Sequence, residues 1–267
     1  MPNNSDEIQT VVRSDYQMTR SQRVFGRYYI ANYDRQPSYD GTNVLMSTGS
    51  GLGLDNRVQT LAAGHDWVLT SNLIAATRFS FQRSRILRIQ GDALPTWGQL
   101  GANVYSYTHE PGQNFYNLSV TNGWATPAFP GKFTSTTPQF SEDVDWVKGA
   151  HSFSFGGMWI RPFEDADGPF QANGTFSFNG TRAGGATAQD RLGMADFLIG
   201  LPSSFSQGGS QIVAEKMNYV GIYGQDVWRV NNRLTLNVGL RWEPYLAAKD
   251  QNGFLTAFNM RVPARAA

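Results

Sequence analysis

Apolar and polar residues alternate strictly along several stretches of the chain. In Leu234–Glu243 one face is wholly apolar, formed by Leu234, Leu236, Val238, Leu240 and Trp242. Leu73–Ser84 and the stretches that begin at Val24 and Phe140 alternate in the same way. A period of two predicts antiparallel strands with one apolar face and one polar face. Val58–Leu69 and Tyr219–Val230 mix both kinds of residue on both faces, so the pattern leaves their orientation open.

Short and long connections alternate between these expected strands. The short ones are Thr19–Gln22, Thr70–Asn72, Lys148–Ala150 and Asn231–Asn232, and the long ones are Pro37–Leu54, Gly91–Thr137 and Asp165–Glu215. Structureless connections beyond about 12 to 15 residues are uncommon in compact soluble domains. Transmembrane β-barrels, in contrast, have short turns on the periplasmic side and long loops outside. The alternation therefore favours a barrel.

Strand length and tryptophan positions support the same interpretation. Several stretches alternate for 10 or more residues. This suits the roughly 9 to 11 residues that cross a bilayer better than the 5 or 6 of soluble strands. Trp67, Trp146 and Trp228 lie close to short connections, where barrels carry aromatic girdles. We predict an all-β, antiparallel up-and-down transmembrane β-barrel segment with about 8 to 10 long strands, and an incomplete barrel. The alternative is that these are core tryptophans of a soluble sandwich.

The composition narrows the possible functions. Charged residues are only 16% of the chain, against roughly 25% in typical soluble domains, and the net charge is +1, so we expect no nucleic-acid partner. Without cysteine there is no disulfide, thiolate zinc site or cysteine nucleophile. The three histidines are scattered, and no catalytic triad or carboxylate pair stands out. We predict no enzymatic activity, no cofactor and no metal site.

Three segments carry a family resemblance. Gly221–Tyr245, GIYGQDVWRVNNRLTLNVGLRWEPY, resembles a hairpin of TonB-dependent receptor barrels of the Oar-like subgroup. Lys148–Arg161, KGAHSFSFGGMWIR, and the run ADFLIGLPSSF resemble segments of the same subgroup. The residues of the hairpin that carry the resemblance are Gln225, Asp226, Trp228, Leu234, Leu236, Gly239, Arg241 and Glu243.

The resemblance implies an outer-membrane receptor that binds an extracellular nutrient and takes it up with energy relayed by TonB. Its expected partners are outer-membrane lipid, the TonB system through a plug region, and an unknown small-molecule or oligomeric nutrient. A barrel of that class has about 22 strands. Because no plug domain, TonB box or signal peptide is visible, we expect residues 1–267 to be a partial barrel domain, a fragment of a longer receptor.

The loop Gly91–Thr137 is rich in aromatic residues among polar ones. We predict ligand contacts from Trp97, Tyr105, Tyr107, Tyr116 and Trp124, because aromatic faces suit carbohydrate or other amphipathic ligands. The competing interpretation is that these rings pack the loop on itself. In another long loop, Arg191–Gly200 has partial helical spacing and predicts a short helix.

Two other functions remain open from the sequence. One is a small complete outer-membrane barrel that acts as an adhesin or structural anchor. The other is a secreted carbohydrate-binding β-sandwich, which would need shorter strands. The sequence does not identify the transported substrate.

Overall fold

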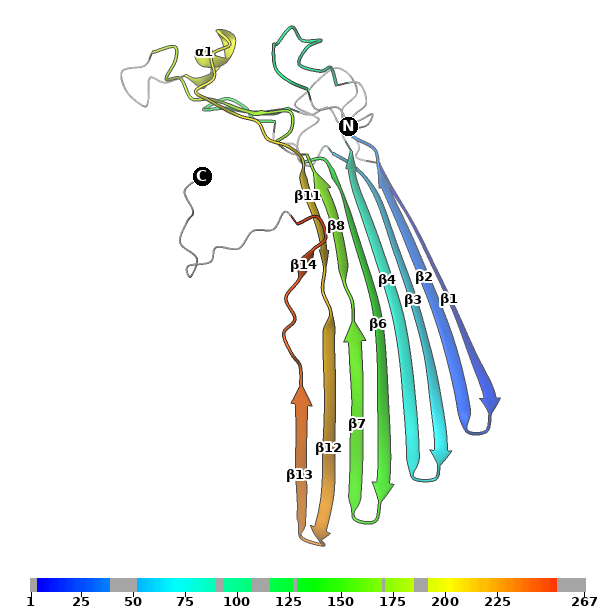
Figure 1. The fold of residues 1–267 in the computed structure, drawn as a ribbon. Coiled ribbons are helices and arrows are strands. Elements are labelled where there is room, and N and C mark those ends of the chain that lie inside the picture. The colour runs from blue at the N-terminus through cyan, green and yellow to red at the C-terminus, as the bar shows by residue number, and fades with distance from the viewer. Residues whose placement is uncertain are drawn as a thin grey trace, which may run out of the picture.

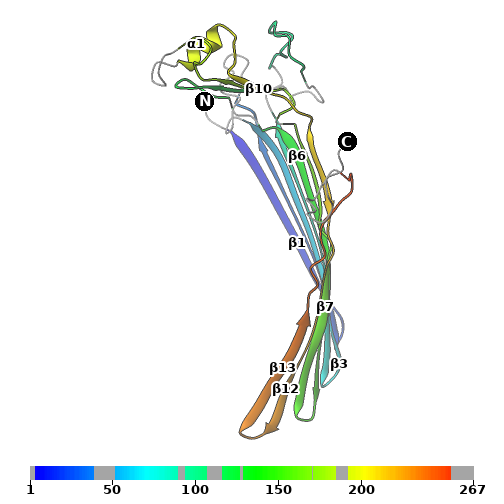
Figure 2. The same cartoon turned by 60° about the vertical axis from the view of Figure 1, so that its left-hand side comes forward.

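The computed structural model describes residues 4–38, 52–89, 94–106, 116–126, 129–169, 171–184 and 192–253. These residues form an 11-stranded sheet and a separate 3-stranded sheet. The long strands of the larger sheet are, in spatial order, β1 (Ser5–Thr19), β2 (Gln22–Arg35), β3 (Gly53–Thr70), β4 (Leu73–Ile89), β6 (Gly131–Lys148), β7 (His151–Ile160), β12 (Tyr219–Asn231) and β13 (Leu234–Trp242). They lie side by side as a curved wall (Figures 1 and 2). The all-β antiparallel prediction is confirmed.

Neighbouring long strands are joined by tight turns at one end of the wall. The turns join β1 to β2, β3 to β4, β6 to β7 and β12 to β13, which are the four short connections predicted from the sequence. Gly149, in the turn between β6 and β7, has φ +63°, a conformation that glycine adopts without steric cost. Strict up-and-down hairpins of this kind fix the register of each strand pair.

The register separates the sheet into one apolar and one polar face. One row of paired residues runs through Ala63, Phe79, Phe140, Trp159 and Val220. The adjacent row, on the opposite face, runs through Gly64, Arg78, Ser141, Met158 and Gly221. We call these two surfaces the apolar face and the polar face. The orientation left open by the sequence is thereby decided: Leu61 and Trp67 of β3, and Ile222 of β12, lie on the apolar face.

Three short strands extend the wall on the side away from the tight turns. They are β8 (Phe163–Gly168), β11 (Gln211–Lys216) and β14 (Lys249–Asp250), and β8 pairs with both β6 and β11. Pro162, which lacks a backbone N–H, separates β8 from β7.

The long connections are shorter than the sequence predicts, because strands of the wall extend into their ends. Gly53–Leu54, Gly131–Thr137, Asp165–Gly168 and Gln211–Glu215 belong to strands. These strand ends are short or lack a clear alternation of apolar and polar residues, so the sequence pattern gives no signal for them. Backbone pairing and polar contacts hold them in the sheet. Ser135 Oγ, for example, donates to Glu164 at 2.6 Å. Most of Pro37–Leu54 lies outside the described residues.

A second group of segments lies at the loop end of the wall, opposite the tight turns (Figure 1). We call residues 94–106, 116–126, 171–184 and 192–210 the loop module. It contains the 3-stranded sheet, with β9 (Thr175–Phe178) between β5 (Asn117–Val120) and β10 (Ser204–Ser206), and the helix α1 (Gly193–Leu198). The predicted short helix is therefore confirmed. The β5–β9 pairing is parallel, and it joins two loops that are far apart in the sequence.

Burial is concentrated in or beside the loop module and not in the wall. The buried hydrophobic residues among those described are Leu52, Leu94, Trp97, Tyr116, Val120, Ala172 and Phe178, none of which lies on a long strand. On β13, by contrast, Val238 is 68% and Leu240 79% exposed. A soluble sandwich would bury such a face against a second sheet. The alternative of a secreted β-sandwich is therefore wrong.

The described sheet is open, with β1 at one edge and β13 and β14 at the other. The described residues therefore form a curved wall and not the small closed barrel considered as an alternative. Among them, no helix has the length and apolar character needed to cross a membrane.

Candidate ligand-binding site

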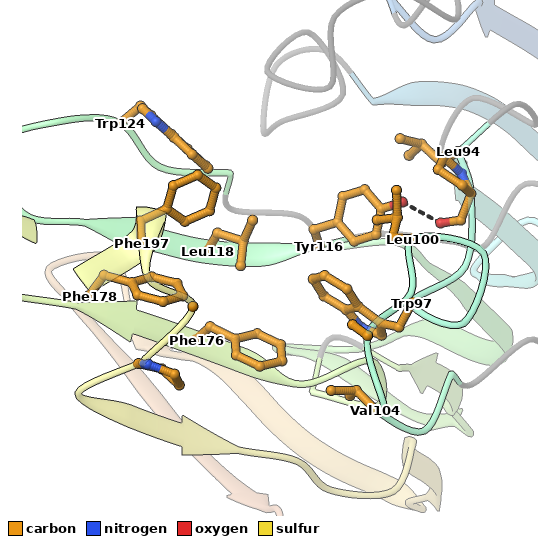
Figure 3. A pocket seen from close by; sticks show the side chains of 14 residues that line it. Leu94, Trp97, Leu100, Val104, Tyr116, Leu118, Trp124, Phe176, Phe178 and Phe197 are labelled. Atoms are coloured by element: carbon orange, nitrogen blue, oxygen red, sulfur yellow. Dashed lines mark hydrogen bonds between the residues drawn. The ribbon is translucent and has the colours of Figure 1, made fainter. Parts of the chain in front are cut away.

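The loop module contains a cavity of about 730 Å³. This volume is in the range of small-molecule sites, roughly 300 to 1,000 Å³. The side chains that line it are apolar apart from the polar atoms of three aromatic rings, and they come from the loops within Gly91–Thr137 and Asp165–Glu215 (Figure 3). The aromatic residues that line it are Trp97, Tyr116, Trp124, Phe176, Phe178 and Phe197.

Trp97 and Tyr116 form the inner part of the cavity. Their ring centroids are 4.7 Å apart, and the exposed fractions of the two residues are 9% and 5%. The Trp97 indole N–H donates to the carbonyl oxygen of Asn173 at 2.7 Å, which links the first loop to the second. The Tyr116 hydroxyl donates to the carbonyl oxygen of Pro95 (dashed line in Figure 3). Both rings are fixed in position by these bonds.

The second loop supplies three rings that the sequence analysis did not select. Phe176 meets Trp97 edge-on at 5.0 Å, and Phe197 of α1 lies 5.0 Å from Trp124 in a T-shaped arrangement. Phe178 in turn meets Phe197 at 5.3 Å. The alternating FSF of β9 was the available signal, because its two phenylalanines lie on one face of a strand.

The predicted site residues divide into three groups. Trp97, Tyr116 and Trp124 line the cavity together. Tyr105 is 70% exposed and is not part of the lining, so the structure does not bring it into this site. Tyr107 lies outside the described residues. The rings pack the loops against each other and still leave a cavity, so ligand contact by Trp97, Tyr116 and Trp124 stays a prediction.

A buried carboxylate anchors the turn beside α1. Asp196 is 0% exposed and accepts hydrogen bonds from the backbone N–H groups of Gly180 at 2.8 Å, Arg182 at 3.1 Å and Ala183 at 2.6 Å. Burial opposes ionisation, yet these three donors and the charge of Arg182 hold the pKa of Asp196 below its ordinary value. Gly180 has φ +82°, which lets the turn aim its N–H groups at one carboxylate.

We expect this anchor to release in acid. The stability that Asp196 contributes is present above the pKa of an unfolded aspartate, about 4, and is lost as the pH falls through the lower folded-state pKa. Hydrogen-exchange protection factors of the Gly180, Arg182 and Ala183 amides in the full-length protein should therefore fall in acid. Asp196→Asn should lower them already at pH 7, whereas Glu164→Gln, which removes a carboxylate outside the module, should not. Full protection in Asp196→Asn would show that the carboxylate does not anchor the turn.

The residues that carry the family resemblance build the β12–β13 hairpin. The register pairs Gln225 with Gly239 and Trp228 with Leu236. Asp226, Trp228, Leu234 and Leu236 lie on the apolar face, and Gln225, Gly239, Arg241 and Glu243 lie on the polar face. Arg241 and Glu243 form an ion pair, and Asp226 Oδ2 lies 2.6 Å from His151 Nδ1 near the tight turns. These contacts hold the hairpin to itself and to β7, and they give it a structural role.

On the polar face, two aromatic rings cross glycines of a neighbouring strand. Tyr223 of β12 extends over Gly156 of β7 and donates from its hydroxyl to Asp143 of β6 at 2.7 Å. Phe25 of β2 lies over Gly64 of β3 in the same way. The missing side chains make room for the two rings, and Tyr223 links β12 to β6 across β7.

Comparison of the sequence with protein-family models identifies the family of this chain. Residues 1–266 match the family model of the outer membrane beta barrel domain. The chain belongs to this family. The outer membrane barrel domain therefore lies in the bacterial outer membrane with its apolar face toward lipid, and the fold is typical of non-enzymatic proteins. In barrels of this kind the tight turns face the periplasm and the long loops face outward, which places the loop module outside.

Two solved structures resemble the barrel wall. FpvA of P. aeruginosa, in its complex with the heterologous pyoverdine Pvd(ATCC13535) and iron, has a TM-score of 0.50 and 10% sequence identity, over 93% of this chain and 31% of that chain. The outer membrane transporter YddB from Escherichia coli has a TM-score of 0.45 and 11% identity, over 92% of this chain and 29% of that chain. At such identities the likeness to FpvA shows the fold alone. The chain spans under a third of both structures. No curated protein sequence matches it.

Proposed function

We propose that this chain is part of the barrel wall of a TonB-dependent outer-membrane receptor, which binds an extracellular nutrient and passes it to the periplasm. The observation that carries the proposal is the position of a cavity of small-molecule size in the loop module. The module lies at the outer end of a wall that has one apolar face and one polar face. An apolar face suits lipid, a polar face suits a water-filled or plugged lumen, and an outward cavity suits capture of a ligand.

The family membership supports the membrane setting, and the residues of the Gly221–Tyr245 hairpin support the TonB-dependent class and its Oar-like subgroup. The likeness to FpvA, whose structure holds an iron-bound pyoverdine, is compatible with uptake of a nutrient complex. Because both edges of the wall are open in the part of the chain that the structure describes, the proposal includes further strands that close the barrel. It also includes a plug that contacts TonB. Neither catalysis nor a cofactor is part of this role.

The proposal is tested by uptake in living cells. A strain that lacks the full-length gene is compared with its parent on defined media, each with one iron chelate, vitamin, oligosaccharide or peptide as the limiting nutrient. We expect a growth defect on one nutrient class, the same defect in a strain without TonB, and rescue by the gene only where TonB is present. Rescue that is independent of TonB, or the absence of any nutrient-specific defect, would contradict the proposal.

A further inference from the structure

The side chains that line the loop-module cavity offer few hydrogen-bonding groups for a polar ligand. Two of the three hydrogen-bonding groups on its aromatic rings are already used: Trp97 Nε1 donates to Asn173 and the Tyr116 hydroxyl donates to Pro95. The described residues include several buried side-chain nitrogen and oxygen atoms without a partner, and none of these belongs to the cavity wall. A sugar or a charged chelate placed here would lose water and gain few hydrogen bonds.

Charge is also kept out of the cavity. None of the residues that line it carries a charge. Arg182 and Asp196 are the charged residues among those described in the loop module, and both side chains have other partners. Arg182 donates from Nε to the carbonyl oxygen of Pro202 at 3.3 Å, and Asp196 accepts the N–H groups of its turn. An ionised ligand group would therefore be desolvated without a counter-charge, which is strongly unfavourable.

The apolar surface continues from the cavity onto the outside of the module. The residues next to Phe197, Gly200 and Pro202 of the lining are large, apolar and more than half exposed: Leu198 is 76%, Ile199 53% and Leu201 52% exposed. Leu100, in the lining itself, is 54% exposed. An apolar molecule that reaches the module thus meets apolar side chains before and after it enters the cavity.

We infer that the cavity of the loop module binds an uncharged, largely apolar small molecule, held by the faces and edges of its aromatic rings. This inference rests on the proposed function, because it names the chemical class of the ligand that the outer end of the receptor captures. The sequence alone predicted amphipathic ligands, and the inference narrows this class. Carbohydrates are disfavoured, because two of the three hydrogen-bonding groups on the aromatic rings of the wall are already used.

The test is equilibrium dialysis of the full-length receptor in lipid nanodiscs at pH 7, with binding to empty nanodiscs subtracted. The probes are 2-naphthol, which is uncharged, 2-naphthoate, which has a similar shape and a negative charge, and maltotriose. We expect saturable binding of 2-naphthol that is at least about tenfold tighter than that of 2-naphthoate, since the charge would be buried unpaired. No saturable binding of 2-naphthol, or equally tight binding of 2-naphthoate or maltotriose, would overturn the inference.

Variants locate the binding in the cavity. Trp124→Ala should weaken 2-naphthol binding about fivefold, the loss expected for one aromatic contact, and Trp124→Phe should retain most of it. Tyr105→Ala is the matched control, because it removes an exposed ring of the same loop outside the lining. Unchanged binding in Trp124→Ala would place the ligand elsewhere and overturn the inference. Dialysis needs no energy source, so the two experiments can fail separately. Failed uptake in cells together with intact 2-naphthol binding contradicts only the proposed function. TonB-dependent uptake in cells without 2-naphthol binding contradicts only this inference.

Discussion

Phe79→Arg is expected to destabilise the folded barrel by about 2 to 4 kcal/mol, the cost of an arginine on the lipid face near the bilayer midplane. Phe79 is on the apolar face and 39% exposed, between Ala63 and Phe140 in the register. It lies about six positions beyond Leu73, the first residue of β4 after the tight turn. At roughly 3.3 Å per residue and a strand tilt of about 40°, this distance is about 15 Å along the membrane normal, close to the bilayer midplane. The measurement is urea unfolding of the full-length protein, together with the heat-dependent shift in gel mobility that marks folded barrels.

Ser80→Arg is the matched control for this substitution. Ser80 is the next residue of β4, and the register places it on the polar face across from Ala62 and Gln139. An added arginine there faces the lumen and should change stability by no more than about 0.5 kcal/mol. Equal losses in the two variants, or a larger loss for Ser80→Arg, would mean that the apolar face does not face lipid.

The hairpins of the wall could be predicted from the sequence because their causes are local. Alternation with a period of two and a few turn residues fix β13, β4 and the four tight turns, and partial helical spacing is enough to find α1. The sequence also predicts that the apolar side of these strands faces lipid, because the strands are long enough to cross a bilayer and tryptophans lie near the tight turns.

The faces of β3 and β12 could not be assigned, and the structure shows why. On β12, Tyr223 lies on the polar face, where alternation predicts no aromatic ring. On β3, Gly64 has no side chain that could indicate its face, and its partner Phe25 is a second ring on the polar face. A binary pattern does not distinguish a ring that contacts lipid from a ring that crosses a glycine of the next strand. The deciding information is the pairing between strands, which is not local.

The candidate site could be predicted only in part for a similar reason. Trp97, Tyr116 and Trp124 were found because they cluster in one loop. Phe176, Phe178 and Phe197 come from another loop, and they meet the first set only because β5 and β9 pair in parallel and Trp97 binds the carbonyl oxygen of Asn173. Neither contact has a signal in a single sequence.

Gly156→Ala is expected to destabilise the protein by about 1 to 3 kcal/mol, as for other overpacked positions. A Cβ atom at Gly156 would lie 2.5 Å from the carbonyl oxygen of Glu142, 2.6 Å from Asp143 Oδ1 and 2.9 Å from Tyr223 Cε1. The Tyr223 ring would have to move, and with it the hydrogen bond to Asp143. Gly157→Ala is the matched control, because its Cβ atom would meet the nearest atoms, on Gly221 and Ile222, at 3.4 Å, which requires little movement. Urea unfolding of both full-length variants measures the difference.

A double-mutant cycle shows whether the loss at Gly156 acts through the ring that crosses it. If the added methyl group acts mainly by displacing Tyr223, Gly156→Ala should cost less in a Tyr223→Ala background, with a coupling free energy of about 0.5 to 3 kcal/mol. If the clash with the backbone of β6 dominates, the two substitutions should be additive, because the carbonyl oxygen of Glu142 is present in both backgrounds. Tyr223→Phe separates the parts of the ring contact: it keeps the ring over Gly156 and removes only the hydroxyl that donates to Asp143. A loss in Tyr223→Phe as large as that in Tyr223→Ala would assign the link between β12 and β6 to this hydrogen bond, and a small loss would assign it to the packing of the ring on the glycine.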